Sequence, residues 1–247
     1  MAMVSPLRAW CGRALVVGAG GIGSAVVAAL ERRAPGLERL VTSRQPQAAP
    51  ALPARRLQLD LASEASLARL AATLADGPAL RLVINTAGLL QGDGISPEKR
   101  LSQVSRQALE TSFRVNAFGP LLLAQALEPL LPRQEPCHFA SLSARVGSIG
   151  DNRLGGWYAY RAAKAAQNQL LRTLALEWRR RLPQACVSLL HPGTTATPLS
   201  QPFRANVPSQ QLFSPARAAE HLLDVLEGLT PEQSGGFWAW DGQPIPW

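Results

Sequence analysis

Cysteine and histidine are scarce in this chain of 247 residues, and neither forms a pattern. The cysteines are odd in number, far apart and without a CxxC pair: Cys11, Cys137 and Cys186. This predicts reduced, buried thiols in a cytoplasmic protein rather than a disulfide framework. The histidines share no metal-ligand spacing: His138, His191 and His221. We therefore expect no metal site.

Long hydrophobic runs are also missing. No apolar run approaches the roughly 18 residues that a membrane-spanning helix needs, and the run 14–17 is too short for a secretory signal. We therefore expect no membrane segment. Hydrophobic residues still make up 47% of the chain, enough for a sheet covered on both faces. The length suits one α/β domain, so we expect residues 1–247 to form a single domain.

Lysine is nearly absent among the basic residues. Only Lys99 and Lys164 are lysine among 25 basic residues, and the net charge is +8. The arginines are scattered along helical segments without interleaved aromatic residues, which indicates solvated helix faces, so we expect no nucleic-acid partner. Because arginine is the usual positive charge of this chain, a lysine indicates a position where arginine would not serve.

Strand-like apolar runs alternate with helix-like segments along the chain. The expected strands are 14–17, 39–42, 56–59, 80–85, 138–142, 186–190 and 237–240. The expected helices are 22–33, 63–75, 101–131, 158–181 and 215–229. This alternation predicts an α/β fold, a Rossmann-like doubly wound parallel sheet of about seven strands with helices on both faces. Ligands of such sheets bind at the carboxyl ends of the strands.

Two stretches lack periodicity, 45–53 and the proline-rich 192–215. We expect the second to act as a lid over the ligands, because connections of this length are often functional. Its apolar side chains suit an apolar or aromatic carbonyl compound: Leu199, Phe203, Val207, Leu212 and Phe213.

A glycine-rich turn follows the first expected strand. Gly18, Gly20 and Gly23 match GxGxxG within the run Gly18-Ala19-Gly20-Gly21-Ile22-Gly23. Such glycines let the backbone approach a pyrophosphate, which the following helix N-terminus stabilises. The alternative is a glycine turn without a ligand.

The end of the second expected strand carries no carboxylate. Many NAD-binding folds place an acid there to hold the ribose 2′-hydroxyl, but this chain has Thr42-Ser43-Arg44. A hydroxyl group at Ser43 and a guanidinium group at Arg44 suit a 2′-phosphate. The sequence therefore predicts NADP(H) in preference to NAD(H), and the alternative is a solvated surface arginine.

Tyr160 and Lys164 lie four residues apart at the start of an expected helix, so they share one helix face. A phenol titrates near about pH 10, and a nearby ammonium group lowers that pKa by stabilising the phenolate. The pair can donate a proton to a carbonyl or accept one from an alcohol. The alternative is a packing tyrosine beside a solvated lysine. Tyr158 points elsewhere.

With these motifs the chain resembles the short-chain dehydrogenase/reductase family over nearly its whole length. The matching motifs are the glycine turn, Asp60-Leu61, Asn85-Thr86-Ala87-Gly88, Val115-Asn116, the Ser143 region, Tyr160 with Lys164, and Pro192-Gly193-Thr194. Segments 143–149, 155–158 and 240–242 are similar to the C-factor-like branch of that family.

The resemblance implies a cofactor site along the strand ends. The glycine turn from Gly18 to Gly23, Gly21 and Ile22 included, would hold the phosphates. Asp60 and Leu61 would flank the adenine. The end of the fourth strand would lie against the cofactor through three residues: Asn85, Ala87 and Gly88.

The resemblance also implies the catalytic roles. Asn116 would bend its helix and hold a water that relays protons to Lys164, which would also bind the nicotinamide ribose. The carboxamide would contact Pro192, Gly193 and Thr194. The family often pairs through its two long helices, which implies a homodimer or a homotetramer, although some members are monomers.

Two departures from the family pattern affect these roles. Gly18 and Gly21 have two residues between them where the family usually has three, so the phosphates would sit slightly differently. The usual second serine of a Ser-Ser pair corresponds to Ala144 in one alignment, and three serines compete for its role: Ser141, Ser143 and Ser148. We choose Ser143, because it ends the fifth strand where the cleft opens, with Ser148 as the alternative.

These observations predict an NADP(H)-dependent oxidoreductase that reduces an aldehyde or ketone to an alcohol, or catalyses the reverse. Tyr160 is the expected acid, Lys164 lowers its pKa, and Ser143 polarises the carbonyl oxygen. The alternative is a C-factor-like signalling protein that binds the nucleotide with little or no catalysis. The presence of Tyr160, Lys164 and Asn116 together favours the enzyme.

Overall fold

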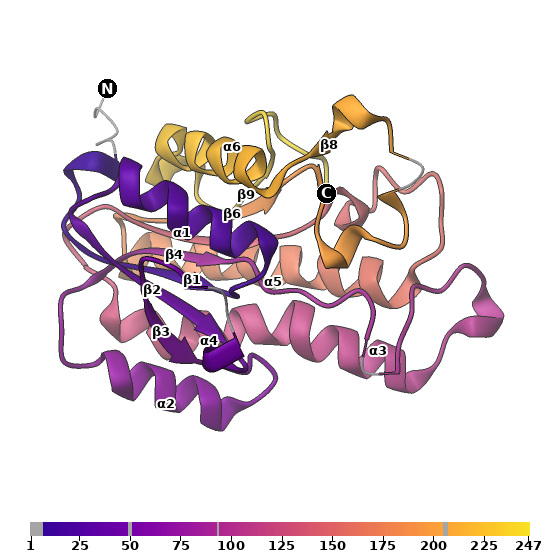
Figure 1. Ribbon diagram of the computed structural model, residues 1–247, viewed down its shortest axis with the longest axis horizontal. Helices are drawn as coiled ribbons and strands as arrows, with labels where there is room; N and C mark the ends of the chain where they lie inside the picture. The colour runs from indigo at the N-terminus through magenta and orange to yellow at the C-terminus, as the bar shows by residue number, and fades with distance from the viewer. Residues whose placement is uncertain (1–6, 49–50, 93, 205–206) are drawn as a thin grey trace.

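A seven-stranded parallel sheet forms the centre of the molecule (Figure 1). The computed structural model describes residues 7–48, 51–92, 94–204 and 207–247. The strands are β1 (Gly12–Val17), β2 (Leu37–Ser43), β3 (Arg55–Gln58), β4 (Leu80–Asn85), β5 (Cys137–Leu142), β6 (Ala185–His191) and β9 (Gly236–Ala239). Their order is β3-β2-β1-β4-β5-β6-β9, with every neighbouring pair parallel. The predicted fold class is confirmed.

Helices cover both faces of this sheet, as the apolar strands require. The helices α1 (Gly21–Arg33) and α6 (Pro215–Gly228) pack on one face, and α2 (Glu64–Leu74), α4 (Gly119–Leu127) and α5 (Tyr158–Arg181) pack on the other (Figure 1). Every residue of β4 and β5 is buried. Burial on both faces explains why these strands are continuous apolar runs rather than alternating ones.

The prediction of one continuous helix over residues 101–131 is wrong in detail. The structure has a 3₁₀ turn at Leu101–Gln103, then α3 (Arg106–Phe113), a π-helical turn at Arg114–Phe118, α4 and a 3₁₀ turn at Glu128–Leu130. Ser105 caps α3 by accepting from the Ala108 N–H at 3.1 Å. Pro120 has no N–H to return to the carbonyl of Asn116, so a regular α-helix cannot pass this point.

The segment 192–215 contains structure that the sequence did not predict. Two short strands, β7 (Thr194–Thr195) and β8 (Leu212–Phe213), pair in parallel and bring its two ends together. Between them lie 3₁₀ turns at Pro198–Ser200 and Ser209–Gln211. The segment is therefore a closed loop with a fixed base. Residues 205–206 of the expected lid lie outside the described residues.

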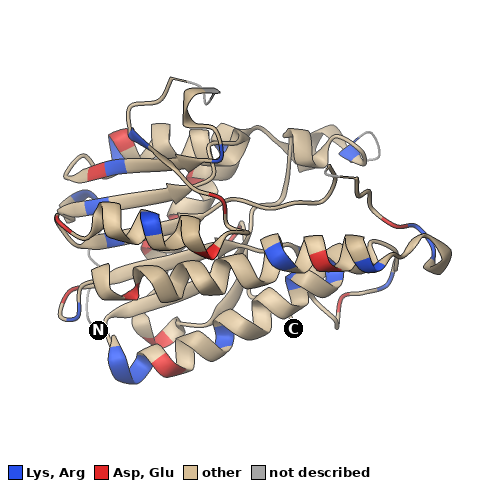
Figure 2. Ribbon diagram, turned by 90° about the horizontal axis from the view of Figure 1, so that it is seen from below, with Lys and Arg blue, Asp and Glu red and all other residues tan. Residues whose placement is uncertain are grey.

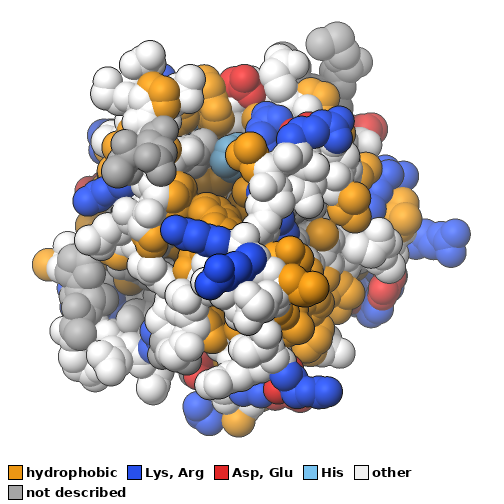
Figure 3. Space-filling view, turned by 90° about the vertical axis from the view of Figure 1, so that its right-hand side faces the viewer, with side chains coloured by type: hydrophobic (Ala, Val, Ile, Leu, Met, Phe, Trp, Pro, Cys, Tyr) orange, Lys and Arg blue, Asp and Glu red, His pale blue; other side chains and the backbone are white. Residues whose placement is uncertain are grey.

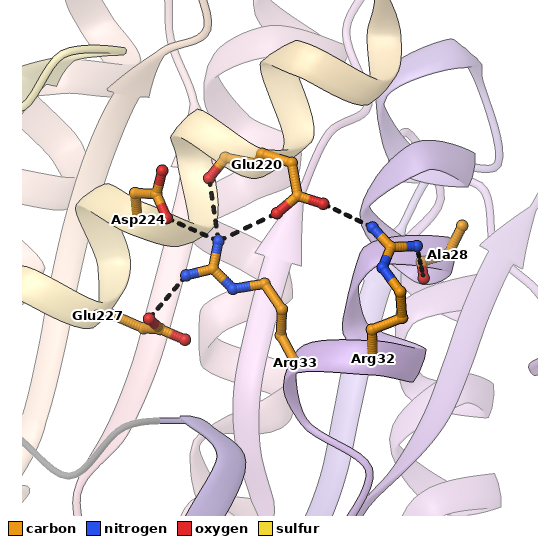
Figure 4. Close-up of polar contacts among 6 residues, drawn as sticks. All are labelled: Ala28, Arg32, Arg33, Glu220, Asp224 and Glu227. Atoms are coloured by element: carbon orange, nitrogen blue, oxygen red, sulfur yellow. Dashed lines mark hydrogen bonds and ion pairs between the residues drawn. The ribbon is translucent and has the colours of Figure 1, made fainter.

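An ion-pair cluster joins α1 to α6 (Figure 4). Arg33 binds Glu220, Asp224 and Glu227 at 3.2, 2.7 and 2.7 Å. Arg32 binds Glu220 at 2.6 Å. Arg33 is the better buried of the two, with a side chain 20% exposed against 67% for Arg32. We therefore assign Arg33 the larger part in holding these helices together.

Elsewhere the charged positions are spread along helices and connecting loops (Figure 2). In the part of the chain that the structure describes, no helix combines the length and apolarity needed to cross a membrane. The same residues contain no group of three or more potential His, Cys, Asp or Glu metal ligands.

Cys137 and Cys186 are buried as predicted, and burial raises the pKa of each thiol to about 12. The prediction was wrong for Cys11, which is exposed because it lies just before β1 rather than in the sheet.

Candidate active site

The strand order reverses between β1 and β4, and the candidate site residues gather at the carboxyl ends of these strands and their neighbours. Open parallel sheets bind ligands at such a switch point. Figure 3 views the molecule from the right-hand side of Figure 1, where hydrophobic side chains surround a hollow that basic side chains cross.

The glycine turn between β1 and α1 is tightly built. Gly18 has φ +99°, which favours glycine. A Cβ on Gly23 would lie 1.9 Å from the Gly18 carbonyl oxygen, so only glycine fits there. The Thr86 hydroxyl donates to the carbonyls of Val17 and Gly18 at 2.9 and 3.1 Å. The end of β4 is thereby tied to the turn.

Gly20 differs from its neighbours because a Cβ added to it would meet nothing within 4 Å. It is the N-cap residue of α1, and no side chain caps that helix. Ile22 follows in the first turn and packs against the core on the α1 face. Uncapped N–H groups beside open space suit a phosphate group. The chain therefore has a cradle that fits the diphosphate of a dinucleotide.

The end of β2 lies beside this turn, because Thr42 pairs with Val17. The Gly18 N–H donates to the Thr42 carbonyl at 3.2 Å. Ser43 is partly exposed and accepts from the Gln45 N–H at 3.1 Å, while Arg44 is exposed. Ser43 and Arg44 thus follow the end of β2 beside the cradle, and their role in binding a 2′-phosphate stays a prediction.

Two other predicted cofactor residues have structural contacts of their own. Asp60 accepts from the Ala62 N–H at 2.9 Å in the turn before α2, and Leu61 is buried in the core. Asn85 is fully buried, since its amide donates to the Ser141 hydroxyl at 2.9 Å and accepts from the Ala87 N–H at 3.2 Å. Asn85 therefore shapes the end of β4 through both ends of its amide.

Asn116 joins the π-helical turn to the chain after β4. Its amide accepts from the Leu89 N–H at 2.8 Å and donates to the Leu89 carbonyl at 2.7 Å. Gly88 lies close by: a Cβ there would be 3.4 Å from Asn116 Oδ1 and 3.9 Å from Lys164 Nζ. The structure thus brings Gly88, Asn116 and Lys164 together, although their sequence positions are far apart.

The start of α5 is held in an unusual conformation. Gly155, Gly156 and Trp157 have φ values of +64°, +69° and +53°, and Trp157 is the one described non-glycine residue with positive φ. Glu98, only 4% exposed, accepts from the Trp157 N–H through its carbonyl and from the Ala159 N–H through its carboxylate. Its carboxylate suits the positive end of the helix dipole. Nothing in the sequence pattern pointed to Glu98.

Tyr160 and Lys164 are buried together on α5, with exposures of 9% and 2%. The Lys164 ammonium group donates to the Leu142 carbonyl at 2.7 Å and to Gln167 Oε1 at 2.8 Å. It lies 5.8 Å from the centre of the Tyr160 ring. Burial lowers the pKa of Lys164 to about 7 and raises the pKa of Tyr160. In this arrangement the ammonium group is directed at protein carbonyls rather than at the phenol.

The candidate serines differ in where their hydroxyl groups are directed. Ser143 donates to Asn168 Oδ1 at 2.7 Å, and the Asn168 amide nitrogen donates to the Gly147 carbonyl at 3.4 Å. The Ser143 proton is therefore engaged within the protein. Ser148 is buried and accepts from the Asp151 N–H at 3.1 Å, which leaves its own proton for another acceptor. The third serine, Ser141, accepts from Asn85 and Gln167.

The loop after β6 reaches both the glycine turn and the start of α5. Pro192, Gly193 and Thr194 follow β6 directly, and Gly193 has φ +72°. A Cβ on Gly21 would lie 2.9 Å from the Thr197 methyl group, so the loop covers the glycine turn.

At the other end, the ring of Phe203 lies 5.0 Å from that of Trp157, which lies 6.4 Å from the ring of Tyr160. The loop predicted as a lid therefore contacts the residues beside Tyr160.

Gln167 and Asn168 are further polar residues of the site that the sequence reasoning missed. Both are buried on α5, three and four residues after Lys164. Polar side chains on the buried face of an amphipathic helix are the signal that could have identified them.

Comparisons with known proteins agree with this architecture. The family model described as short chain dehydrogenase matches residues 12–208. A dehydrogenase of 1-hydroxy-2-glutathionyl-2-methyl-3-butene from Rhodococcus sp. (strain AD45) is 34% identical over 192 residues, which are 76% of this chain and 78% of the relative. C-signal of Myxococcus xanthus is 34% identical over 148 residues, which are 60% of this chain and 83% of C-signal.

Solved structures share the fold at lower identity. Carbonyl reductase Sniffer of D. melanogaster superimposes with a TM-score of 0.82 at 24% identity, over 96% of this chain and 100% of Sniffer. NADPH-bound carbonyl reductase from chicken fatty liver has a TM-score of 0.81 at 24% identity, over the same shares of both chains. Since the family model spans most of the chain and the bacterial dehydrogenase more than three quarters of it, the protein is an oxidoreductase of the short-chain dehydrogenase family.

Proposed function

We propose that the protein reduces an aldehyde or ketone to an alcohol with NADP(H), or catalyses the reverse, with Tyr160 as the acid or base. The observation that carries this proposal is the burial of Tyr160 and Lys164 side by side on α5, at the same end of the sheet as the uncapped glycine turn. A proton donor and a dinucleotide cradle at one end of one sheet are the parts that carbonyl reduction needs.

The nicotinamide dinucleotide would supply or accept the hydride. The chain would hold it through the cradle at Gly18 to Gly23, the strand ends and the segment after β6: Ser43, Arg44, Asp60, Leu61, Asn85, Ala87, Gly88, Lys164, Pro192, Gly193 and Thr194. Asn85 and Leu61 would contribute by shaping the wall, because their side chains are engaged or buried. The missing acid at the end of β2, with Arg44 in its place, supports a preference for NADP(H) over NAD(H). NADPH in the chicken carbonyl reductase agrees with this preference.

During reduction, the Tyr160 hydroxyl group donates a proton to the carbonyl oxygen of the substrate. Burial raises the pKa of this phenol, which keeps it protonated and ready to donate. Lys164 favours the phenolate when its ammonium group approaches, and Asn116 holds the segment next to it. We propose Ser143 as the residue that orients the carbonyl, which requires its proton to leave Asn168. Ser148 is the second candidate.

We further propose that the substrate is an apolar or aromatic carbonyl compound or the corresponding alcohol. The Phe203 and Trp157 rings lie in contact beside Tyr160 and offer flat apolar surface. The relatives' names concern the same chemistry, a hydroxy-compound dehydrogenase and carbonyl reductases.

The second candidate function is signalling with nucleotide binding alone, which the similarity to C-signal of Myxococcus xanthus favours. Titration of the purified protein with NADPH and NADH, followed by turnover on a panel of aldehydes, ketones and quinones, separates the two functions. Oxidoreductase function predicts consumption of NADPH with at least one class. Tight NADPH binding without turnover on the whole panel would favour the signalling function.

A further inference from the structure

A chain of buried amides connects Lys164 to the sheet. The Gln167 amide nitrogen donates to the Ser141 hydroxyl at 3.0 Å and to the Leu142 carbonyl at 3.2 Å. The same Ser141 hydroxyl accepts from Asn85 at 2.9 Å. Gln167 Oε1, at the other end of the amide, accepts from Lys164. The network thus runs from β4 through β5 to α5 and ends on the ammonium group.

The orientation of the Gln167 amide follows from its partners. Lys164 has only protons to offer, and the Leu142 carbonyl can only accept. A flipped amide would place its nitrogen against the ammonium group and its oxygen against the carbonyl. Oε1 is therefore the atom that faces Lys164, and Gln167 is fully buried, so water does not take its place.

The charged form of Lys164 depends on its two acceptors, the Leu142 carbonyl oxygen and Gln167 Oε1. Among the described residues, no carboxylate pairs with it, and its side chain is 2% exposed. Burial is the cause that lowers its pKa to about 7. The Leu142 carbonyl and Gln167 Oε1 are the acceptors that oppose this effect.

The buried Glu98 carboxylate accepts from the Ala159 N–H at the start of α5, and the other charged groups near this part of the helix are engaged elsewhere or exposed. Arg145, in the 3₁₀ turn packed on α5, pairs with Asp151 at 2.7 Å. His191, at the end of β6, has its pKa lowered to about 4 mainly by burial, so it is neutral at neutral pH. The remaining charged groups on elements packed against this part of α5 are exposed: Arg106, Glu110 and Arg114.

We propose that Gln167 is a positioning residue for the reaction: its side-chain oxygen holds the Lys164 ammonium group in place and keeps it charged. This inference rests on the proposed role of Lys164 beside Tyr160 and adds the group that controls it. An uncharged Lys164 could neither stabilise a phenolate nor offer three donors. Gln167 therefore sets the upper pH at which carbonyl reduction proceeds.

Two substitutions should move the pKa of Lys164 in opposite directions. Gln167→Leu removes the acceptor at similar size, and we expect the pKa of Lys164 to fall by about 1–2 units, the equivalent of one hydrogen bond to a charged group. Gln167→Glu places a carboxylate at the same position, and we expect that pKa to rise. A residue that merely fills space would not give opposite shifts.

The two lysines of the chain make this measurement direct. Protein grown with isotope-labelled lysine gives two Cε signals, and Lys99→Arg assigns them. Lys99 is exposed and serves as the internal reference in every titration. Gln169→Leu, two residues further along α5 and exposed, is the matched control and should leave the Lys164 titration unchanged.

The pH profile of carbonyl reduction gives the second readout. Charged Lys164 exists below its pKa, so the alkaline limb should move to lower pH in Gln167→Leu and should not do so in Gln167→Glu. An unchanged Lys164 pKa in both variants would overturn the inference. If Gln167→Leu does not fold, an unchanged Lys164 pKa in Gln167→Glu alone would overturn it. Full turnover in Tyr160→Phe would instead overturn the proposed function, and the lysine titration would be unaffected by that result.

Discussion

Gly20 and Gly23 lie three residues apart in the turn after β1, and their surroundings are opposite. A Cβ on Gly20 would meet nothing within 4 Å, whereas a Cβ on Gly23 would lie 1.9 Å from the Gly18 carbonyl oxygen. Alanine at each position therefore separates the fold from the ligand cradle. Gly20 has φ −77°, which alanine adopts without strain.

For Gly23→Ala we expect a large loss of stability. Ordinary contacts of a Cβ begin at 3.4 Å, so the backbone must move by more than an ångström. Overpacking typically costs about 1–3 kcal/mol and occasionally more, and the upper end applies because the opposing atom is backbone. A loss of about 3 kcal/mol lowers Tm by roughly 6–12 °C for a domain of this size.

For Gly20→Ala we expect unchanged or slightly higher stability and weaker nucleotide binding. Replacing glycine at a compatible position stabilises the fold by about 0.4–1 kcal/mol, and the lower preference for alanine than for glycine at an N-cap offsets this gain. The new methyl group would occupy the space proposed for the diphosphate and cost at least one hydrogen bond to a charged group, about 1.5–3 kcal/mol. That corresponds to a loss of about tenfold or more in NADPH affinity.

The assay is thermal unfolding of both variants with NADPH titration by fluorescence. Wild-type NADPH affinity in Gly20→Ala, in a protein of wild-type Tm, would refute the assignment of this cradle to the phosphates. A wild-type Tm in Gly23→Ala would show that the turn is less tightly packed than the structure indicates.

Three further predictions concern the cofactor, the fold and the carbonyl. Arg44→Ala should weaken NADPH binding by about tenfold or more and leave NADH nearly unchanged; equal losses in titrations with both would contradict the 2′-phosphate assignment. Arg33→Gln should lower the free energy of unfolding by about 1–2 kcal/mol, less at high salt, and more than Arg32→Gln, because Arg33 is better buried and binds three carboxylates; equal effects in denaturant unfolding would argue against the cluster. Ser143→Ala should reduce turnover more than Ser148→Ala, and a loss confined to the latter would transfer the role to Ser148.

The seven strands of the main sheet could be predicted from the sequence, with ends displaced by no more than two residues. The central strands β1, β4, β5 and β6 are buried at nearly every position, so each is an apolar run between turns. The short strands β7 and β8 could not be predicted, because a strand of two residues is too short to show a periodic pattern. The family resemblance implied a bend at Asn116, but the apolar pattern continues through Pro120 and gave no sign of the π-helical turn, which depends on a tertiary contact between Asn116 and Leu89.

The positions of the candidate site residues could also be predicted, because they follow strand ends or share a helix face. Their side-chain contacts could not. That Lys164 lowers the pKa of Tyr160 stays a prediction, and in this arrangement the ammonium group is bound to the Leu142 carbonyl and Gln167. Such contacts depend on how α5 packs on β5, which the spacing of Tyr160 and Lys164 does not contain.

Turnover of Tyr160→Phe beside Tyr158→Phe tests the central claim most directly. Tyr160→Phe removes one hydroxyl group and leaves the ring, so folding and NADPH binding should survive. Tyr158 is 41% exposed and serves as the matched control. We expect carbonyl reduction to fall by about 10²–10⁴-fold in Tyr160→Phe, the usual contribution of general acid–base catalysis, and to remain near wild type in Tyr158→Phe. Wild-type turnover in Tyr160→Phe would contradict the account.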